Sequence, residues 1–163
     1  MKKIIFIHLL SAFCAYSYSE VHIYTIDNWL IRSISEEDLV VSKWSEESDN
    51  LLSLEMFKPY CVCSGLRISL NGHSKYKEGT DIEGTMRLDN FRKQKVKLKL
   101  TYVGKGYNTF QLTAFPNIRG KTILNLHTEY GEATFVIAGL KEVMKQSERI
   151  CETQIDYLKK VYY

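Results

Sequence analysis

The sequence predicts a mainly β protein, α+β by strict counting: an antiparallel sheet or β-sandwich of about seven to nine short strands, with one C-terminal amphipathic helix packed on it. Between residues 20 and 139, apolar and polar residues alternate in short runs that end at turn-forming residues, as in half-buried antiparallel strands. Residues 140–163 instead repeat apolar residues at helical spacing. Strands and helices do not alternate along the chain, which argues against a doubly wound fold.

The first nineteen residues have the pattern of a signal peptide. Lys2 and Lys3 precede an apolar run over residues 4–15, and small residues stand at Ser17 and Ser19. The run is shorter than the roughly 20 apolar residues that span a bilayer. We therefore expect cleavage after Ser19, a periplasmic or extracellular location, and no transmembrane segment in the mature chain.

The mature chain, residues 20–163, has the length of a single domain. Loss of the two signal-peptide lysines leaves 20 Lys and Arg against 19 Asp and Glu. This near-neutral balance does not favour nucleic-acid binding. The sequence indicates no oligomeric state.

Four strands are predicted in the N-terminal third. They are residues 21–26, 29–34, 39–43 and 51–57, and the last of them is also compatible with a short helix. Asn28 and the polar stretch 45–50 supply the turns between them. This part of the chain is therefore predicted as short strands joined by turns.

The central and C-terminal strands have a clearer alternation. Residues 66–70 end at an Asn-Gly turn signal, and further strands follow at 82–88, 95–103, 107–115, 122–127 and 133–137. In the clearest strand the predicted inward residues are Val96, Leu98, Leu100 and Tyr102, and the predicted outward residues are Lys95, Lys97, Lys99 and Thr101.

Three cysteines remain after cleavage: Cys61, Cys63 and Cys151. Because an exported protein lies in an oxidising compartment, we expect one disulfide and one remaining thiol. A bridge from Cys61 or Cys63 to Cys151 is favoured over a Cys61–Cys63 bridge, which would close a small, strained ring. The sequence does not choose between Cys61 and Cys63. The isolated histidines His73 and His127 have no ligand-like spacing to these thiols, so no metal site and no cofactor are predicted.

The order of features along the chain supports a resemblance to a known family. An early Trp29, a cysteine before a run of strands, the segment ATFVIAGL at residues 133–140 and a helix containing Cys151 follow one another in this order. This layout resembles small exported bacterial β-sandwich proteins similar to the invasion-associated locus B family. The resemblance implies a periplasmic, non-enzymatic role. The chain departs from that layout in its Cys-x-Cys pair and in its long helix after Cys151.

Basic residues gather in the middle of the chain. Seven of them lie within nineteen residues: Arg87, Arg92, Lys93, Lys95, Lys97, Lys99 and Lys105. One interpretation is a patch for an anionic partner. The other is an edge strand whose lysines prevent sheet-to-sheet pairing.

These observations favour one function class over two others. No catalytic motif can be assembled, so the first hypothesis is an exported soluble binding or interaction module without catalytic activity. It would act as a periplasmic inhibitor or immunity-type protein on another protein, or bind an anionic envelope polymer. The alternatives are a small cell-envelope hydrolase and a structural component of envelope assembly.

Overall fold

The computed structural model describes residues 23–33, 38–57, 60–114 and 120–162, with the backbone alone at residue 64 and residues 155–162. The predicted signal peptide lies outside these residues. The described part contains ten strands and one helix, α1 (Leu140–Tyr162), which confirms the predicted class with more strands than expected. The strands are β1 (Ile23–Ile26), β2 (Trp29–Ser33), β3 (Asp38–Trp44), β4 (Leu51–Phe57), β5 (Val62–Asn71), β6 (Asp81–Leu88), β7 (Gln94–Val103), β8 (Tyr107–Leu112), β9 (Ile123–Thr128) and β10 (Gly131–Val136).

All ten strands belong to one antiparallel sheet with the order β1-β2-β3-β4-β5-β8-β7-β6-β9-β10. The order follows the sequence up to β5, then places β8 beside β5 and returns through β7 to β6. The lysine-rich strand β7 is therefore an interior strand between β8 and β6. Its lysines do not protect a sheet edge, so the edge-strand interpretation is wrong.

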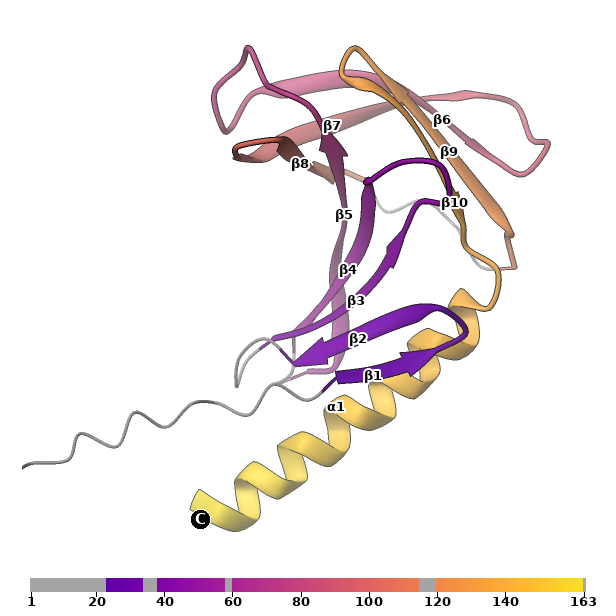
Figure 1. The fold of residues 1–163 in the computed structure, drawn as a ribbon. Coiled ribbons are helices and arrows are strands. Elements are labelled where there is room, and N and C mark those ends of the chain that lie inside the picture. Colours follow the sequence, from indigo (N-terminus) through magenta and orange to yellow (C-terminus); the bar gives the residue numbers. More distant parts are fainter. Residues whose placement is uncertain (1–22, 34–37, 58–59, 115–119, 163) are drawn as a thin grey trace, which may run out of the picture.

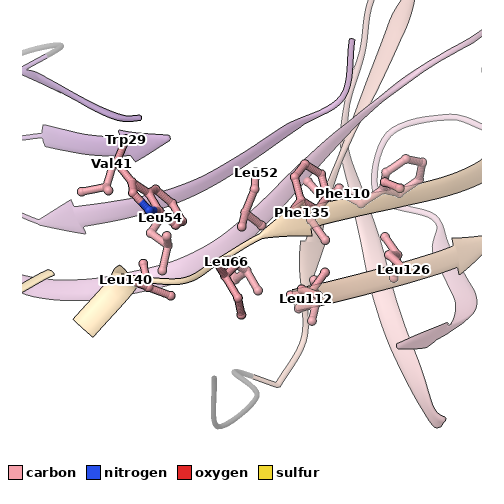
Figure 2. Close-up of a cluster of buried hydrophobic side chains, with 14 of the residues drawn as sticks. Trp29, Val41, Leu52, Leu54, Leu66, Phe110, Leu112, Leu126, Phe135 and Leu140 are labelled. Atoms are coloured by element: carbon pink, nitrogen blue, oxygen red, sulfur yellow. The ribbon is translucent and has the colours of Figure 1, made fainter. Parts of the chain in front are cut away.

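The sheet bends strongly, so that the half formed by β6–β10 crosses the half formed by β1–β5 (Figure 1). The apolar faces of the two halves share one buried cluster (Figure 2). This cluster contains Leu52 and Leu54 of β4, Phe110 of β8 and Phe135 of β10, and all four are at most 1% exposed. The core is thus continuous across the molecule.

Local turn chemistry sets up the first hairpin. Asp27 and Asn28, between β1 and β2, both have positive φ, as the central residues of a two-residue hairpin turn of type I′ require. Asn and Asp tolerate this conformation better than other non-glycine residues. Trp29 follows the turn directly and is fully buried, and its indole N–H donates to the carbonyl of Ala138 at 3.4 Å.

Helix α1 lies against the β1–β5 half of the sheet (Figure 1). Gly139, with a φ of 78°, turns the chain from β10 into the helix. The inward stripe of α1 is buried in its described part at Leu140, Val143, Ser147 and Cys151. Cys61 forms a disulfide with Cys151 across a Cα–Cα distance of 5.8 Å, and Cys63 stays a free thiol. Within the described residues no helix is both long and apolar enough to cross a membrane.

Candidate functional site

The charged and polar side chains on the outward side of β6, β7, β9 and β10, with Lys93 of the β6–β7 connection, form the surface that we call the outer face. The strand residues are Asp81, Glu83, Thr85 and Arg87 of β6, Lys95, Lys97 and Lys99 of β7, Asn125 and His127 of β9, and Glu132 and Thr134 of β10. The three lysines are exposed, and alternate residues of a strand lie about 7 Å apart. The predicted lysine row is therefore a row in the structure, on the side of the sheet opposite the core.

The remaining predicted cations do not all join this row. Arg87 and the exposed Lys93, in the β6–β7 connection, lie together at one end of the outer face. Arg92 is exposed in the same connection but does not line that end of the face. Lys105 lies in the turn beyond the opposite end of β7. Five of the seven predicted cations thus belong to the outer face.

The cations of the outer face have no ion-pair partner among the described residues. Glu83 and Asp81 of β6 stand opposite Lys97 and Lys99 in register. The ion pairs among the described residues nevertheless include Arg67–Glu55, Lys75–Glu129 and His127–Glu132, and none involves a lysine of the outer face. The carboxylates of β6 therefore lower the net charge of the face without holding its lysines.

Asp89, the single acid inside the basic segment, is used locally. Its Oδ1 accepts hydrogen bonds from the hydroxyl of Thr122 at 2.7 Å and from the backbone N–H groups of Thr122 and Ile123 at 2.9 and 2.8 Å. These bonds, the Thr122 hydroxyl first, lower the pKa of Asp89. Its carboxylate joins the β6–β7 turn to the start of β9 and does not neutralise the outer face.

A small hollow lies where β6, β9 and β10 meet. We call it the β6–β9–β10 hollow; its volume is about 100 Å³, and its outward lining side chains are Thr85, Arg87, Lys93, Asn125, His127, Glu132 and Thr134. The pairing register produces this set, because Thr85 stands beside His127 and Arg87 stands beside Asn125. Lys93 enters from the β6–β7 connection. Sequence reasoning identified Arg87 and Lys93, but not their neighbours on β9 and β10.

Two acceptors in this hollow are already engaged. Glu132 Oε1 lies 2.7 Å from Nδ1 of His127, and the Oδ1 atom of Asn125 accepts the hydroxyl hydrogen of Thr134 at 2.9 Å. The amide NH₂ of Asn125 is then the group left to donate into the hollow. The sequence showed His127 as an isolated histidine, since its partner Glu132 becomes its neighbour only through the β9–β10 register.

A wider hollow of about 520 Å³ continues along the outer face toward β7. Thr85 and His127 line both hollows, and Lys95 and Lys97 line only the wider one. Glu83 and Glu129 also contribute to it, but Glu129 is paired with Lys75. The small hollow and the lysine row are therefore neighbouring parts of one surface.

A third hollow, which sequence reasoning did not identify, is a groove of about 760 Å³ between α1 and strands β4 and β5. Cys63 lines it together with apolar residues, and two lysines and two glutamates of α1 form its rim: Lys141, Lys145, Glu142 and Glu148. Burial raises the pKa of the Cys63 thiol, against a smaller lowering effect of the Gly65 backbone. A thiol with a raised pKa is a weak nucleophile at neutral pH. Because the rim has equal numbers of positive and negative side chains, it indicates no preference for the charge of a ligand.

Comparison with known proteins adds no further constraint: no protein-family model, no curated protein and no solved structure matches this chain. The resemblance to the invasion-associated locus B family stays a prediction. In the described part of the chain, no three His, Cys, Asp or Glu side chains lie close enough together to hold a metal ion.

Proposed function

We propose that this protein is an exported binding module without catalytic activity, and that it recognises an anionic partner through the outer face. Export rests on the signal-peptide pattern of residues 1–19. The observation that supports binding is the gathering of five cations on one exposed surface without an ion-pair partner in the described residues: Arg87, Lys93, Lys95, Lys97 and Lys99. Such a surface attracts anions and accelerates their association.

The composition of the outer face favours an anionic envelope polymer over a protein as the partner. Stable protein interfaces have an apolar or aromatic centre from which water is excluded. The lysine row and the neighbouring positions of β6, β9 and β10 contain charged and polar side chains, and the exposed hydrophobic side chains on this side, Tyr102 and Ile123, stand near strand ends. A row of lysines about 7 Å apart suits a chain of repeated negative charges. A periplasmic inhibitor would have to use a different surface.

Charge reversal of the lysine row tests this proposal. The triple variant Lys95→Glu, Lys97→Glu and Lys99→Glu should lose retention on an envelope fraction and on immobilised polyphosphate. Replacing Lys105, Lys141 and Lys145 by Glu changes the net charge equally on exposed lysines outside the outer face, and this control should keep at least half of the retention. Equal losses in the two triple variants would reject the outer face as the binding surface.

The salt dependence of binding gives a second measurement. Each phosphate neutralised by a lysine releases condensed counterions, so affinity falls as salt rises. We expect the logarithm of the affinity for polyphosphate to fall with the logarithm of the salt concentration by a slope of about 2 to 4 in magnitude, on the order of the number of lysines in contact. A slope near zero would contradict an electrostatic surface.

A further inference from the structure

We propose that the β6–β9–β10 hollow is the seat of one phosphate group of the anionic partner. This inference rests on the proposed function and names the chemistry of the group that the outer face holds. Arg87 and Lys93 would pair with the phosphate oxygens, and the amide of Asn125 and the hydroxyl of Thr85 would donate hydrogen bonds to them.

The size of the hollow fits a single tetrahedral group. Its volume of about 100 Å³ is several times the roughly 10–15 Å³ that a cavity measured in the same way needs to hold one water. This leaves room for a phosphate group. The wider hollow beside it, which shares Thr85 and His127 with the first, provides space for the group that carries the phosphate.

Apart from the second carboxylate oxygen of Glu132, the polar groups of the hollow that have no partner among the described residues can donate hydrogen bonds. The single carboxylate of the hollow, that of Glu132, is bound to His127, and Asn125 Oδ1 is occupied by the hydroxyl of Thr134. Among the described residues, no hydrogen bond holds the hydroxyl of Thr85, and no carboxylate lies within ion-pair distance of Arg87 or Lys93. An anion with several oxygens would satisfy these donors together.

The two cations of the hollow are also placed against each other. Met86 pairs with Gln94 at the start of β7, and Arg87 and Lys93, the residues that come after Met86 and before Gln94, line the same hollow. Two positive charges that line one hollow repel each other. A bound phosphate, with a charge between −1 and −2 near neutral pH, would offset this repulsion, whereas one carboxylate would offset only half of it.

Thermal unfolding with inorganic phosphate tests the seat. At a phosphate concentration tenfold above its Kd, the unfolding midpoint of the unaltered protein should rise by about 4 °C. The double variant Arg87→Gln/Lys93→Gln should lose this saturable rise. Lys105→Gln/Lys141→Gln, which removes the same charge elsewhere, should keep it. The general stabilising effect of phosphate on folded proteins is the same in all three and cancels in the comparison.

The stability of the double variant without phosphate, together with amide shifts, distinguishes a specific phosphate site from nonspecific ion binding. Because Arg87 and Lys93 repel each other, the double variant without phosphate should be at least as stable as the unaltered protein. The single variant Lys93→Gln, in an exposed connection, repeats the test with the least disturbance of the fold. Amide signals of Asn125 and Thr134 should shift with phosphate in the unaltered protein. The proposal would be overturned if phosphate raised the unfolding midpoint of the double variant as much as that of the unaltered protein. It would also be overturned if phosphate shifted only amide signals outside the hollow.

The source of the phosphate is distinguished by the same variants. If it belongs to a lipid headgroup, vesicles of phosphatidic acid but not of phosphatidylcholine should retain the protein, and Arg87→Gln/Lys93→Gln should abolish retention. If it belongs to a polymer, the double variant should weaken polyphosphate binding at least tenfold. The two proposals can fail separately. If the lysine-row variant loses polyphosphate binding but inorganic phosphate has no saturable effect on the unaltered protein, the phosphate seat is refuted and the proposed function still holds.

Discussion

Asp89 is the residue whose charge the structure uses most directly. It has a φ of 47°, which Asp and Asn tolerate, and its lowered pKa records the hydrogen bonds that its charged form accepts from Thr122 and Ile123. A carboxyl whose pKa is lower in the folded state stabilises the protein above its unfolded pKa, and loses that contribution as the pH falls through the folded value. The relevant window therefore lies below about pH 4.

Replacing Asp89 by Asn keeps the turn conformation and removes the charge. We expect Asp89→Asn to be less stable than the unaltered protein at pH 7, because the neutral amide is a weaker acceptor for three donors. The difference should shrink between pH 5 and pH 2.5, as the unaltered protein loses its own carboxylate. Urea midpoints at several pH values measure this. Asp81→Asn removes an exposed carboxylate from the first residue of β6, the strand that precedes Asp89, as a control. A difference for Asp89→Asn that does not change with pH would contradict the prediction.

The cysteines show what single residues could and could not reveal in the sequence. One long-range bridge to Cys151 was predicted, but Cys61 and Cys63 would face the same side of a regular strand. The choice depends on a backbone detail: β5 begins only at Val62, and Cys61 lies in the preceding turn with a φ of 50°. Nothing in the sequence indicates that a particular cysteine adopts a positive φ.

At the scale of elements, strand β7 shows where alternation fails as a predictor. Leu98 and Leu100 are fully buried as predicted, but Tyr102, also predicted inward, is 47% exposed. A β-bulge is the cause: Leu100 pairs with Phe110, and Tyr102 already pairs with Thr109. The extra residue reverses the alternation beyond it, and Tyr102 packs against Tyr107 on the outer side instead. A β-bulge depends on how a strand pairs with its neighbour, and the residue pattern of one strand does not show which strand that neighbour is.

Helix α1 is the element whose attachment can be tested by one substitution. The Cys61–Cys151 bridge spans a sequence separation of 90 residues, and disulfides that close long loops stabilise by about 2–4 kcal/mol. Cys151→Ser should lower the free energy of unfolding by about that amount. Amide hydrogen exchange should increase along residues 140–162, while the strand amides keep their protection.

The free thiol supplies the matched control for this variant. Cys63→Ser changes a half-buried sulfur that takes no part in the bridge, and should cost less than about 1 kcal/mol. If the amides of α1 exchange as slowly in Cys151→Ser as in the unaltered protein, the buried stripe alone holds the helix. The cross-link would then act only on the unfolded chain.

At the scale of the molecule, the strand order explains why the site could be predicted only in part. The strands and the lysine row follow from the local alternation of apolar and polar residues, which can be read from a single sequence. The placement of β8 beside β5 and of β9 beside β6 is set by contacts between distant segments. The β6–β9–β10 hollow consists of such contacts: Arg87 meets Asn125 only through the β6–β9 register. The cations were therefore visible in the sequence, and the hollow between them was not.

The continuous core predicts that both halves of the bent sheet unfold together. Phe135 of β10 is fully buried in the cluster that also contains Trp29 and Leu52 from the other half (Figure 2). Asn50, between β3 and β4, adds a polar link, because its side chain bonds both the backbone N–H of Asn71 and the carbonyl of Glu132. Removing apolar volume from one half should therefore destabilise the other.

Phe135→Ala should lower the free energy of unfolding by about 3–5 kcal/mol, the usual effect of deleting a buried aromatic side chain. The loss should be the same when unfolding is followed by the fluorescence of Trp29, in β2, and by amide exchange in β9, since a shared core makes one cooperative unit. Phe91→Ala removes a ring that is 58% exposed, and should cost much less because little apolar surface is buried there. If Phe135→Ala shifted only the β9 signal, the two halves would be separate folding units, and the outer face could change without altering the β1–β5 half that holds α1.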